Sequence, residues 1–163
     1  MCVRATTRGG FASRAPSSAP RQLLDSVAEA TSEIGLALVL LGEAYERLDE
    51  QTAERLEREL FAPMQLAYGR AQRTYAEFAA RSSLPTRLFE RPPAGAPSHG
   101  VRELLESAVQ AAGRADASLS TLQDSMLPVE VGDPALRAGL EEVRRLIGGL
   151  ALRARELVRT LGR

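Results

Sequence analysis

Three stretches of the chain place apolar or small residues at alternating steps of three and four. This spacing aligns side chains on one stripe of an α-helix, and such a stripe is stable only when another helix covers it. The pattern therefore predicts an all-α protein in which helices pack on helices. The stripes are Leu24, Val27, Thr31, Ile34, Leu38, Leu41, Tyr45, Leu48 and Thr52; then Val101, Leu105, Ala108, Ala112, Ala115, Leu119, Leu122 and Met126; then Leu136, Leu140, Val143, Ile147, Leu150, Ala154, Leu157 and Leu161.

The first stripe predicts one long helix over residues 22–81, following Pro20. After Thr52 the apolar positions recur at steps of four, which lets the stripe drift around the helix. Pro63 lacks a backbone N–H, and its ring clashes with the carbonyl one turn earlier, so we expect a kink near this residue. A straight helix of this length would measure ~90 Å. A bundle of this size therefore requires the helix to fold back or the protein to dimerise.

Residues 82–100 are rich in proline and glycine and predict a linker. Within this linker, we expect three residues either to dock on the helices or to form a short peptide that a partner binds: Leu84, Leu88 and Phe89. A tail over residues 1–21 precedes the first helix. Its first 20 residues carry Arg, Ser, Ala and Gly but no acid, which is typical of a disordered tail or of a mitochondrial or plastid transit peptide. Without such targeting the protein is expected in the cytoplasm.

Residues 101–163 predict a hairpin of two helices, over 101–126 and 134–161. Asp133 is a suitable N-cap and Pro134 a suitable first helical residue. The short loop makes the two helices antiparallel. The Gly148–Gly149 pair indicates either tight packing or a flexible joint. Together with residues 22–81, the hairpin predicts a three- or four-helix bundle, or an elongated coiled coil, in one domain.

The charged residues balance over the chain but are unevenly distributed. The formal net charge is zero, whereas residues 22–60 hold ten acids against three arginines and residues 61–99 hold five arginines against two acids. No long basic face emerges, which argues against nucleic-acid binding, because phosphate contacts dominate that affinity. No apolar run reaches the ~18–20 residues that a membrane-spanning helix needs.

The residues that usually carry catalysis or bind metals are sparse. His99 is the only histidine and lies in the linker, and Cys2 is the only cysteine, so an internal disulfide and a cysteine-based metal site are excluded. The acids are expected to form a solvated face, because they lie on one helix with no histidine among them. We therefore predict a protein without catalytic residues, cofactor or metal. The dense acids are Glu43, Glu46, Asp49, Glu50, Glu54 and Glu57.

The first helix also contains the residues that we predict to contact a partner. Gly35 and Gly42 are seven residues apart and flank a fully apolar segment, which favours close approach of a second helix there. Each candidate has an alternative role in the intramolecular core. The candidates are Leu36, Leu40, Gly42 and Tyr45, with Leu56, Leu60 and Phe61 around the expected kink.

One segment resembles a known family. The run Ile34-Gly35-Leu36-Ala37-Leu38, then Gly42-Glu43-Ala44, Leu48 and Glu50, then Phe61-Ala62-Pro63-Met64-Gln65 is similar to the central helix of endophilin-type BAR domains. The resemblance covers about 30 residues. It implies an elongated antiparallel dimer that senses or shapes membranes. The helix that carries it is acidic here, whereas a membrane-binding face is expected to be basic.

Two functions follow as hypotheses. The first stripe is longer than either helix of the hairpin, so part of it is expected to meet a second copy or another protein. This favours a non-catalytic interaction module, a small subunit or adaptor of a helical assembly. The alternative is a BAR-like homodimer on membrane surfaces.

Overall fold

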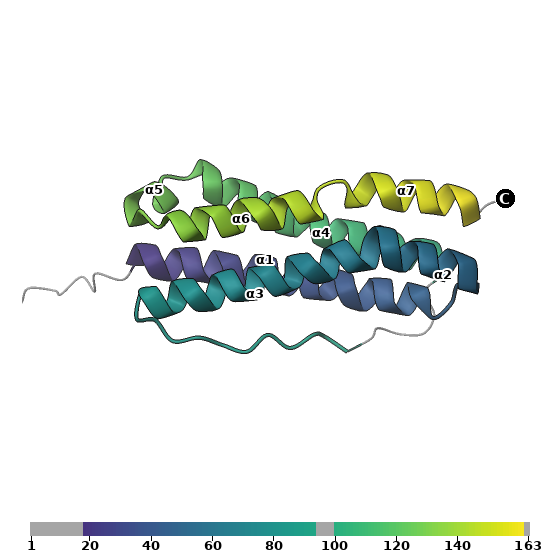
Figure 1. Cartoon of the computed structure of the whole chain (residues 1–163), viewed down its shortest axis with the longest axis horizontal. Coiled ribbons are helices and arrows are strands. Elements are labelled where there is room, and N and C mark those ends of the chain that lie inside the picture. Colours follow the sequence, from purple (N-terminus) through teal and green to yellow (C-terminus); the bar gives the residue numbers. More distant parts are fainter. Residues whose placement is uncertain (1–17, 94–99, 162–163) are drawn as a thin grey trace, which may run out of the picture.

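The computed structural model describes residues 18–93 and 100–161, which fold into an all-α bundle with no strand among them (Figure 1). The bundle consists of four helical rods, each of about 40 Å by the rise of an α-helix. This confirms the all-α prediction and identifies the architecture as a four-helix bundle. The rods are α1 (Ser18–Tyr45); α2 (Glu50–Leu56), η1 (Glu57–Phe61) and α3 (Ala62–Arg81); α4 (Val101–Asp124); and α6 (Pro134–Ile147) with α7 (Leu150–Leu161), while the short α5 (Leu127–Val131) lies between α4 and α6.

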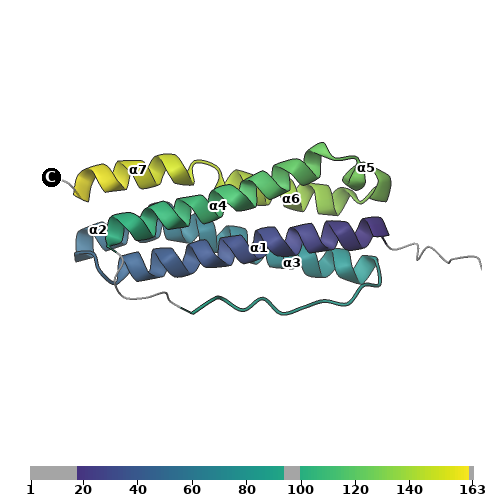
Figure 2. The same ribbon diagram turned by 180° about the vertical axis from the view of Figure 1, so that it is seen from behind.

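Neighbouring rods run antiparallel. Helix α1 packs on α4 and on α3, and α6 packs on α3 and on α4, so the four rods close a square (Figures 1 and 2). Helix α7 continues the α6 rod and contacts α4 and η1. The antiparallel hairpin expected for the C-terminal part of the chain is therefore confirmed.

The three apolar stripes form the core. Nearly every stripe residue that lies inside a long helix is buried, including the polar Thr31, whose hydroxyl donates to the Val27 carbonyl oxygen at 2.7 Å. The stripes leave the core only at their ends, where Tyr45 is 38% exposed and Met126 is 64% exposed. The steps of three and four therefore identified the faces that pack together.

The first helix is not continuous over residues 22–81. It ends at Tyr45, and the chain turns back over residues 46–49 before α2 begins. Asp49 caps the new helix, since its Oδ1 accepts the Thr52 N–H at 2.9 Å and its Oδ2 accepts the Thr52 hydroxyl at 2.7 Å. Capping of this kind stabilises a helix start where the preceding helix could otherwise have continued. The expected single helix was wrong at this point.

Pro63 does not break the helix that contains it. The helix widens into the π-helical segment η1 just before the proline, and the Ala62 N–H bonds to the Glu57 carbonyl oxygen. In a π-turn each N–H bonds to the carbonyl five residues earlier instead of four. This change of hydrogen-bond pattern lets the helix accommodate a proline, which has no N–H to donate. The expected irregularity is present, but as a wider turn over residues 57–61.

The two consecutive glycines form a joint between α6 and α7. Gly148 is extended, at φ −62° and ψ 140°, and Gly149 has a φ of 80°, which a residue with a side chain rarely adopts. The apolar stripe continues across the joint, because Ile147 and Leu150 are both buried. The pair therefore interrupts the helix that was expected to run over residues 134–161.

Residues 82–93, here called the strap, run back along the outside of the bundle from the end of α3 (Figure 1). Leu84 and Phe89 dock on the core as expected, and the Phe89 and Tyr75 rings form a T-shaped pair at a centroid distance of 5.0 Å. The Arg91 guanidinium lies over the Tyr68 ring at 5.4 Å. Leu88 does not dock, because it is 91% exposed.

Asp133 connects the start of α6 to the end of α3. Its Oδ1 accepts the Leu136 N–H at 2.9 Å, which confirms the predicted N-cap, and its carboxylate binds Arg81 through two hydrogen bonds of 2.7 and 3.0 Å. Partial burial opposes ionisation of Asp133, but the bonds from Arg81 and from Leu136 outweigh it and lower its pKa below the ordinary value. The folded state therefore favours the charged carboxylate.

This lowered pKa predicts a pH-dependent contribution to stability. The contribution is complete above the unfolded pKa of about 3.9 and is lost as the pH falls through the lower folded value. Asn also caps helices well, so Asp133→Asn removes mainly the charge. In urea denaturation we expect this variant to be less stable than the wild type at neutral pH, with a difference that shrinks below about pH 4. A difference that is constant with pH would contradict this assignment.

Candidate interaction surface

Two of the seven positions predicted for partner contact lie in the core. Leu56 on α2 and Leu60 on η1 are fully buried, and both belong to the central apolar cluster of the bundle. Phe61 is half-buried against the same cluster. Because the chain turns back at residues 46–49, the stripe that contains Leu56 and Leu60 is covered by the chain's own helices. Neither side chain is available to a partner in this fold.

The other four positions lie on the outer side and at the end of α1. Leu36 and Leu40 are half-buried and pack against the core, and Tyr45 is partly exposed. A Cβ added at Gly42 would meet nothing within 4 Å among the described atoms. The close approach expected at Gly42 is therefore absent from the described part of the chain, and partner contact at these α1 positions stays a prediction.

Among the described glycines, the tightest packing lies elsewhere, where α6 meets α3. A Cβ added at Gly139 of α6 would lie 2.8 Å from Thr74 Cγ2 and closer still to Thr74 Oγ1. At Gly35 of α1 a Cβ would lie 3.1 Å from the Tyr68 ring, so this glycine packs against an aromatic side chain of α3. The sequence signal at Gly139 is a glycine between the stripe residues Leu136 and Leu140.

A groove of about 500 Å³ lies on the outer side of the α3–α6 pair. Leu66 projects from α3 beside this groove and is 65% exposed, while Leu146 of α6 is half-buried in the opposite wall. Gly69 leaves space one turn after Leu66, because a Cβ there would meet no described atom within 4 Å. An exposed leucine therefore stands next to an unfilled apolar hollow.

Arginines dominate the rim of this groove. Arg70 Nε lies 3.0 Å from Glu142 Oε2, and Arg145 Nη2 lies 4.0 Å from the other oxygen of the same carboxylate. Arg73 is exposed, and no ion pair of its side chain occurs within the described ranges. Two guanidinium groups thus share the Glu142 carboxylate, and Arg73 adds a third positive charge, so the rim is basic. We call Leu66, Gly69 and Arg73 of α3, with Arg145 and Leu146 of α6, the Leu66 face.

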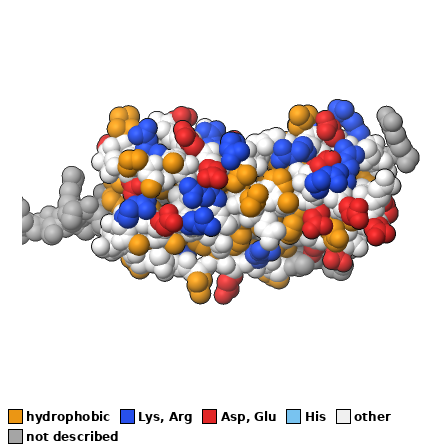
Figure 3. Space-filling view, in the orientation of Figure 1, with side chains coloured by type: hydrophobic (Ala, Val, Ile, Leu, Met, Phe, Trp, Pro, Cys, Tyr) orange, Lys and Arg blue, Asp and Glu red, His pale blue; other side chains and the backbone are white. Residues whose placement is uncertain are grey.

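Charges of both signs surround this face. Figure 3 shows basic side chains over α3 and α6 and hydrophobic ones near the middle of the face, while toward α2 acidic side chains gather beside further basic ones. The acidic part is the sequence-predicted solvated face, with Glu50, Glu54 and Glu57 exposed. A partner on this face would therefore meet both signs of charge within one helix length.

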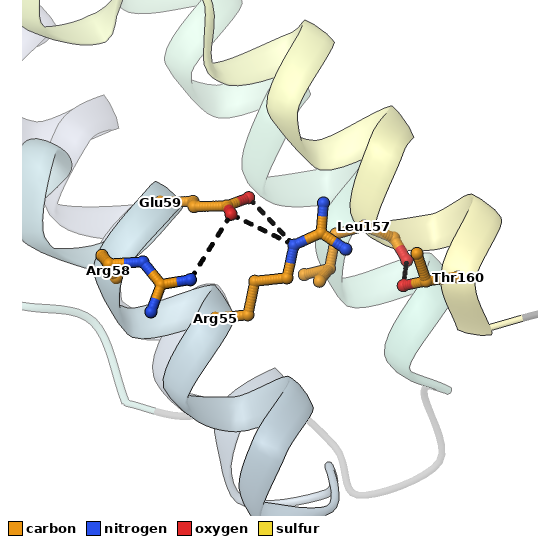
Figure 4. Close-up of polar contacts among 5 residues, drawn as sticks. All are labelled: Arg55, Arg58, Glu59, Leu157 and Thr160. Atoms are coloured by element: carbon orange, nitrogen blue, oxygen red, sulfur yellow. Dashed lines mark hydrogen bonds and ion pairs between the residues drawn. The ribbon is translucent and has the colours of Figure 1, made fainter.

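The charged residues on the side of α2 and η1 that faces α7 pair with one another. Arg55 Nε donates to both Glu59 oxygens, at 3.1 and 3.2 Å, and Arg58 Nη2 lies 3.7 Å from Glu59 Oε1 (Figure 4). On the α7 side, the Thr160 hydroxyl donates to the Leu157 carbonyl oxygen at 2.6 Å. Arg55 and Glu59 thus neutralise each other locally, as i,i+4 pairs on helices usually do. Arg58 keeps most of its side chain in solvent, at 71% exposure.

A second groove, of about 450 Å³, lies between α4 and α7. Its floor includes Leu105 and Ala154, which are buried, and its rim mixes Glu106 with Arg155 and Arg159. It holds no strongly exposed apolar side chain comparable to Leu66 among its lining residues. The Leu66 face is therefore the more suitable of the two for a protein partner.

The part of the chain that the structure covers shows neither a metal-binding cluster nor a membrane-spanning helix. The described residues contain no group of three or more His, Cys, Asp or Glu side chains that could hold a metal ion. His99, Cys2 and most of the predicted tail over residues 1–21 lie outside the described residues. None of the helices among the described residues has the length and apolar character needed to cross a membrane.

The segment that resembles the BAR central helix is divided by the turn at residues 46–49. Gly42-Glu43-Ala44 lies on α1, whereas Pro63 lies on the antiparallel rod that begins with α2. What the resemblance implies for function stays a prediction. No protein family model, no curated protein and no solved structure matches this chain.

Proposed function

We propose that this protein is a non-catalytic helical interaction module that binds a protein partner through the Leu66 face. The observation that carries the proposal is Leu66 itself, a leucine that is 65% exposed beside an apolar groove. Burial of such a side chain stabilises an interface by roughly 1.5–3 kcal/mol. Exposed apolar side chains with a polar rim are typical of protein-binding surfaces.

The rim gives this proposal a preferred partner chemistry. Arg70, Arg73 and Arg145 outnumber Glu142 at the groove, while exposed acids lie toward α2, so an amphipathic helix that carries both signs of charge along its length fits the face. The apolar stripe of the first helix offers no such surface, because the chain covers that stripe by folding back at residues 46–49. A small subunit or adaptor that docks on a larger helical assembly is consistent with this surface.

Affinity purification from the native cells tests the proposal. The tagged wild type is compared with Leu66→Asp and with Leu88→Asp, a matched change at the 91% exposed Leu88 of the strap. We expect stoichiometric co-purifying proteins with the wild type and with Leu88→Asp, and their loss from Leu66→Asp. Helical content measured by circular dichroism should be the same for all three. Equal recovery with Leu66→Asp would contradict the proposed face.

The membrane-binding alternative has its own test. Binding to anionic vesicles that weakens with salt would support a BAR-like function, and no binding at low salt would exclude it.

We place the module in the cytoplasm. A fluorescent reporter fused behind residues 1–20 tests the organellar alternative, since import of the reporter would show that these residues act as a transit peptide.

A further inference from the structure

We propose that the Leu66 face binds a second copy of this chain, with the two α3 helices packed antiparallel about a point between Leu66 and Gly69. This inference rests on the proposed function, because it names the occupant of the same face. The outward-facing residues of the rod formed by α2, η1 and α3 carry the complementary shapes and charges for this pairing.

The outward residues of this rod form a palindromic series. Starting from the centre, exposed residues recur at steps of four in both directions, and a single step of three joins the two halves. The spacing is unchanged when the helix is reversed, so the two halves of the series can face each other across an isologous twofold axis. The series is Glu54, Arg58, Ala62 and Leu66, followed by Gly69, Arg73, Glu77 and Arg81, and all eight residues are exposed.

Shapes match at the centre of this series. In the antiparallel pairing, Leu66 of each copy lies opposite Gly69 of the other. Gly69 leaves open space where a side chain would stand, and the groove beside it is lined by Leu146. Each leucine therefore enters the hollow of the opposite copy, as knobs enter holes between packed helices. Both leucines lose their exposure to water in the same contact.

Charges match on both sides of the centre. Arg58 lies eight residues before Leu66 and Glu77 lies eight residues after Gly69, so each is ~12 Å from its central residue. The antiparallel pairing therefore brings Arg58 of one copy to Glu77 of the other, twice per dimer. Arg58 is 71% exposed, and its ion pair within the described residues is the 3.7 Å contact with Glu59, so its guanidinium can reach a partner. Ala62, opposite Arg73, leaves room for the arginine stem.

The size of this surface indicates a weak dimer. The series spans 28 residues, which is ~42 Å of one helix about 10 Å wide, or roughly 400 Å² from each copy before α6 contributes. Stable interfaces bury about 800 Å² per partner, so we expect a dissociation constant in the micromolar range.

Sedimentation equilibrium of the full chain tests the inference, with reducing agent present so that Cys2 cannot form a disulfide. We expect a monomer–dimer equilibrium whose dissociation constant rises more than tenfold in Leu66→Asp and is unchanged in Leu88→Asp. Arg58→Glu and Glu77→Arg should each raise it about three- to tenfold, and the double variant should return to within about twofold of the wild type. The double variant restores the opposite charges, so a fold defect cannot imitate this result.

Three results would overturn the inference: a monomer up to about 500 μM, a dimer insensitive to Leu66→Asp, or a double variant without recovery. These results are distinguishable from failure of the proposed function. If the wild type is a monomer but captures another protein that Leu66→Asp loses, self-association is wrong and the interaction module stands. If Leu66→Asp changes neither measurement, both proposals fail.

Discussion

Leu60→Ala is expected to lower the free energy of unfolding by about 2–5 kcal/mol, whereas Leu66→Ala should lower it by less than about 0.5 kcal/mol. The two leucines are six residues apart on one rod. Leu60 is fully buried in the π-helical segment, so its truncation leaves a cavity, whereas Leu66 is 65% exposed and leaves none. Urea denaturation followed by circular dichroism at 222 nm (the wavelength of helical ellipticity) measures both changes.

This comparison separates the core from the interface by experiment. Leu60 carried a prediction of partner contact from the sequence, and the structure assigns it to the core. If Leu60→Ala and Leu66→Ala had equally small effects on unfolding, Leu60 would not be packed as described. The assignment of Leu66 to a binding surface would then lose its support, because it depends on Leu60 being buried and Leu66 being exposed.

Gly139→Ala is expected to destabilise the bundle by about 1–3 kcal/mol through overpacking. The added Cβ would overlap the side chain of Thr74, which is 3% exposed on the facing helix α3. Elsewhere in a helix the same change usually stabilises. Gly113 of α4 is the matched control, because a Cβ there meets no described atom within 4 Å, and Gly113→Ala should stabilise by about 0.5–1 kcal/mol.

Thr74→Ala tests the cause of the Gly139 effect. It removes the Oγ1 and Cγ2 atoms that an added Cβ would overlap, and Thr74 Oγ1 has no hydrogen-bond partner among the described residues. We therefore expect Gly139→Ala to cost much less in the Thr74→Ala background, with a coupling energy of about 0.5–3 kcal/mol in the double-mutant cycle. Additive effects, or stabilisation by Gly139→Ala alone, would contradict the close crossing of α3 and α6.

The parts of the fold predicted from the sequence are those that periodicity determines. Steps of three and four identified the buried faces of α1, α4 and the α6–α7 rod, because burial of a stripe is the main force that orients a helix. Local chemistry also predicted the start of α6, where Asp133 and Pro134 have the residue types that a helix N-terminus favours.

The turn after Tyr45 was missed because two signals competed there. The apolar stripe continues through Leu48, and periodicity alone favours one helix. Asp49 followed by Thr52 is a helix-start signal, and the change to steps of four after Thr52 marks a new helix and not a drifting stripe. Long-range packing decided between the two, since the reversed rod covers the stripe of α1.

The candidate surface was only partly predictable. The sequence pointed to self-association or a protein partner, but the residues chosen from the apolar stripe were those most needed by the core, as Leu56 and Leu60 show. Leu66 lies off that stripe. The sequence could have indicated this surface through a leucine that lies between small and charged residues of the outward side. That leucine indicates a binding surface only once it is known which side of the rod faces α6.

In-cell photo-crosslinking tests the central claim, binding through the Leu66 face, most directly. A photoreactive amino acid is placed at position 66 in one variant and at position 88, on the exposed strap, in another. We predict discrete crosslinked products from position 66, either with a second copy of the chain or with a defined protein partner, and none of these from position 88. The same products from both positions, or none from position 66, would contradict the account.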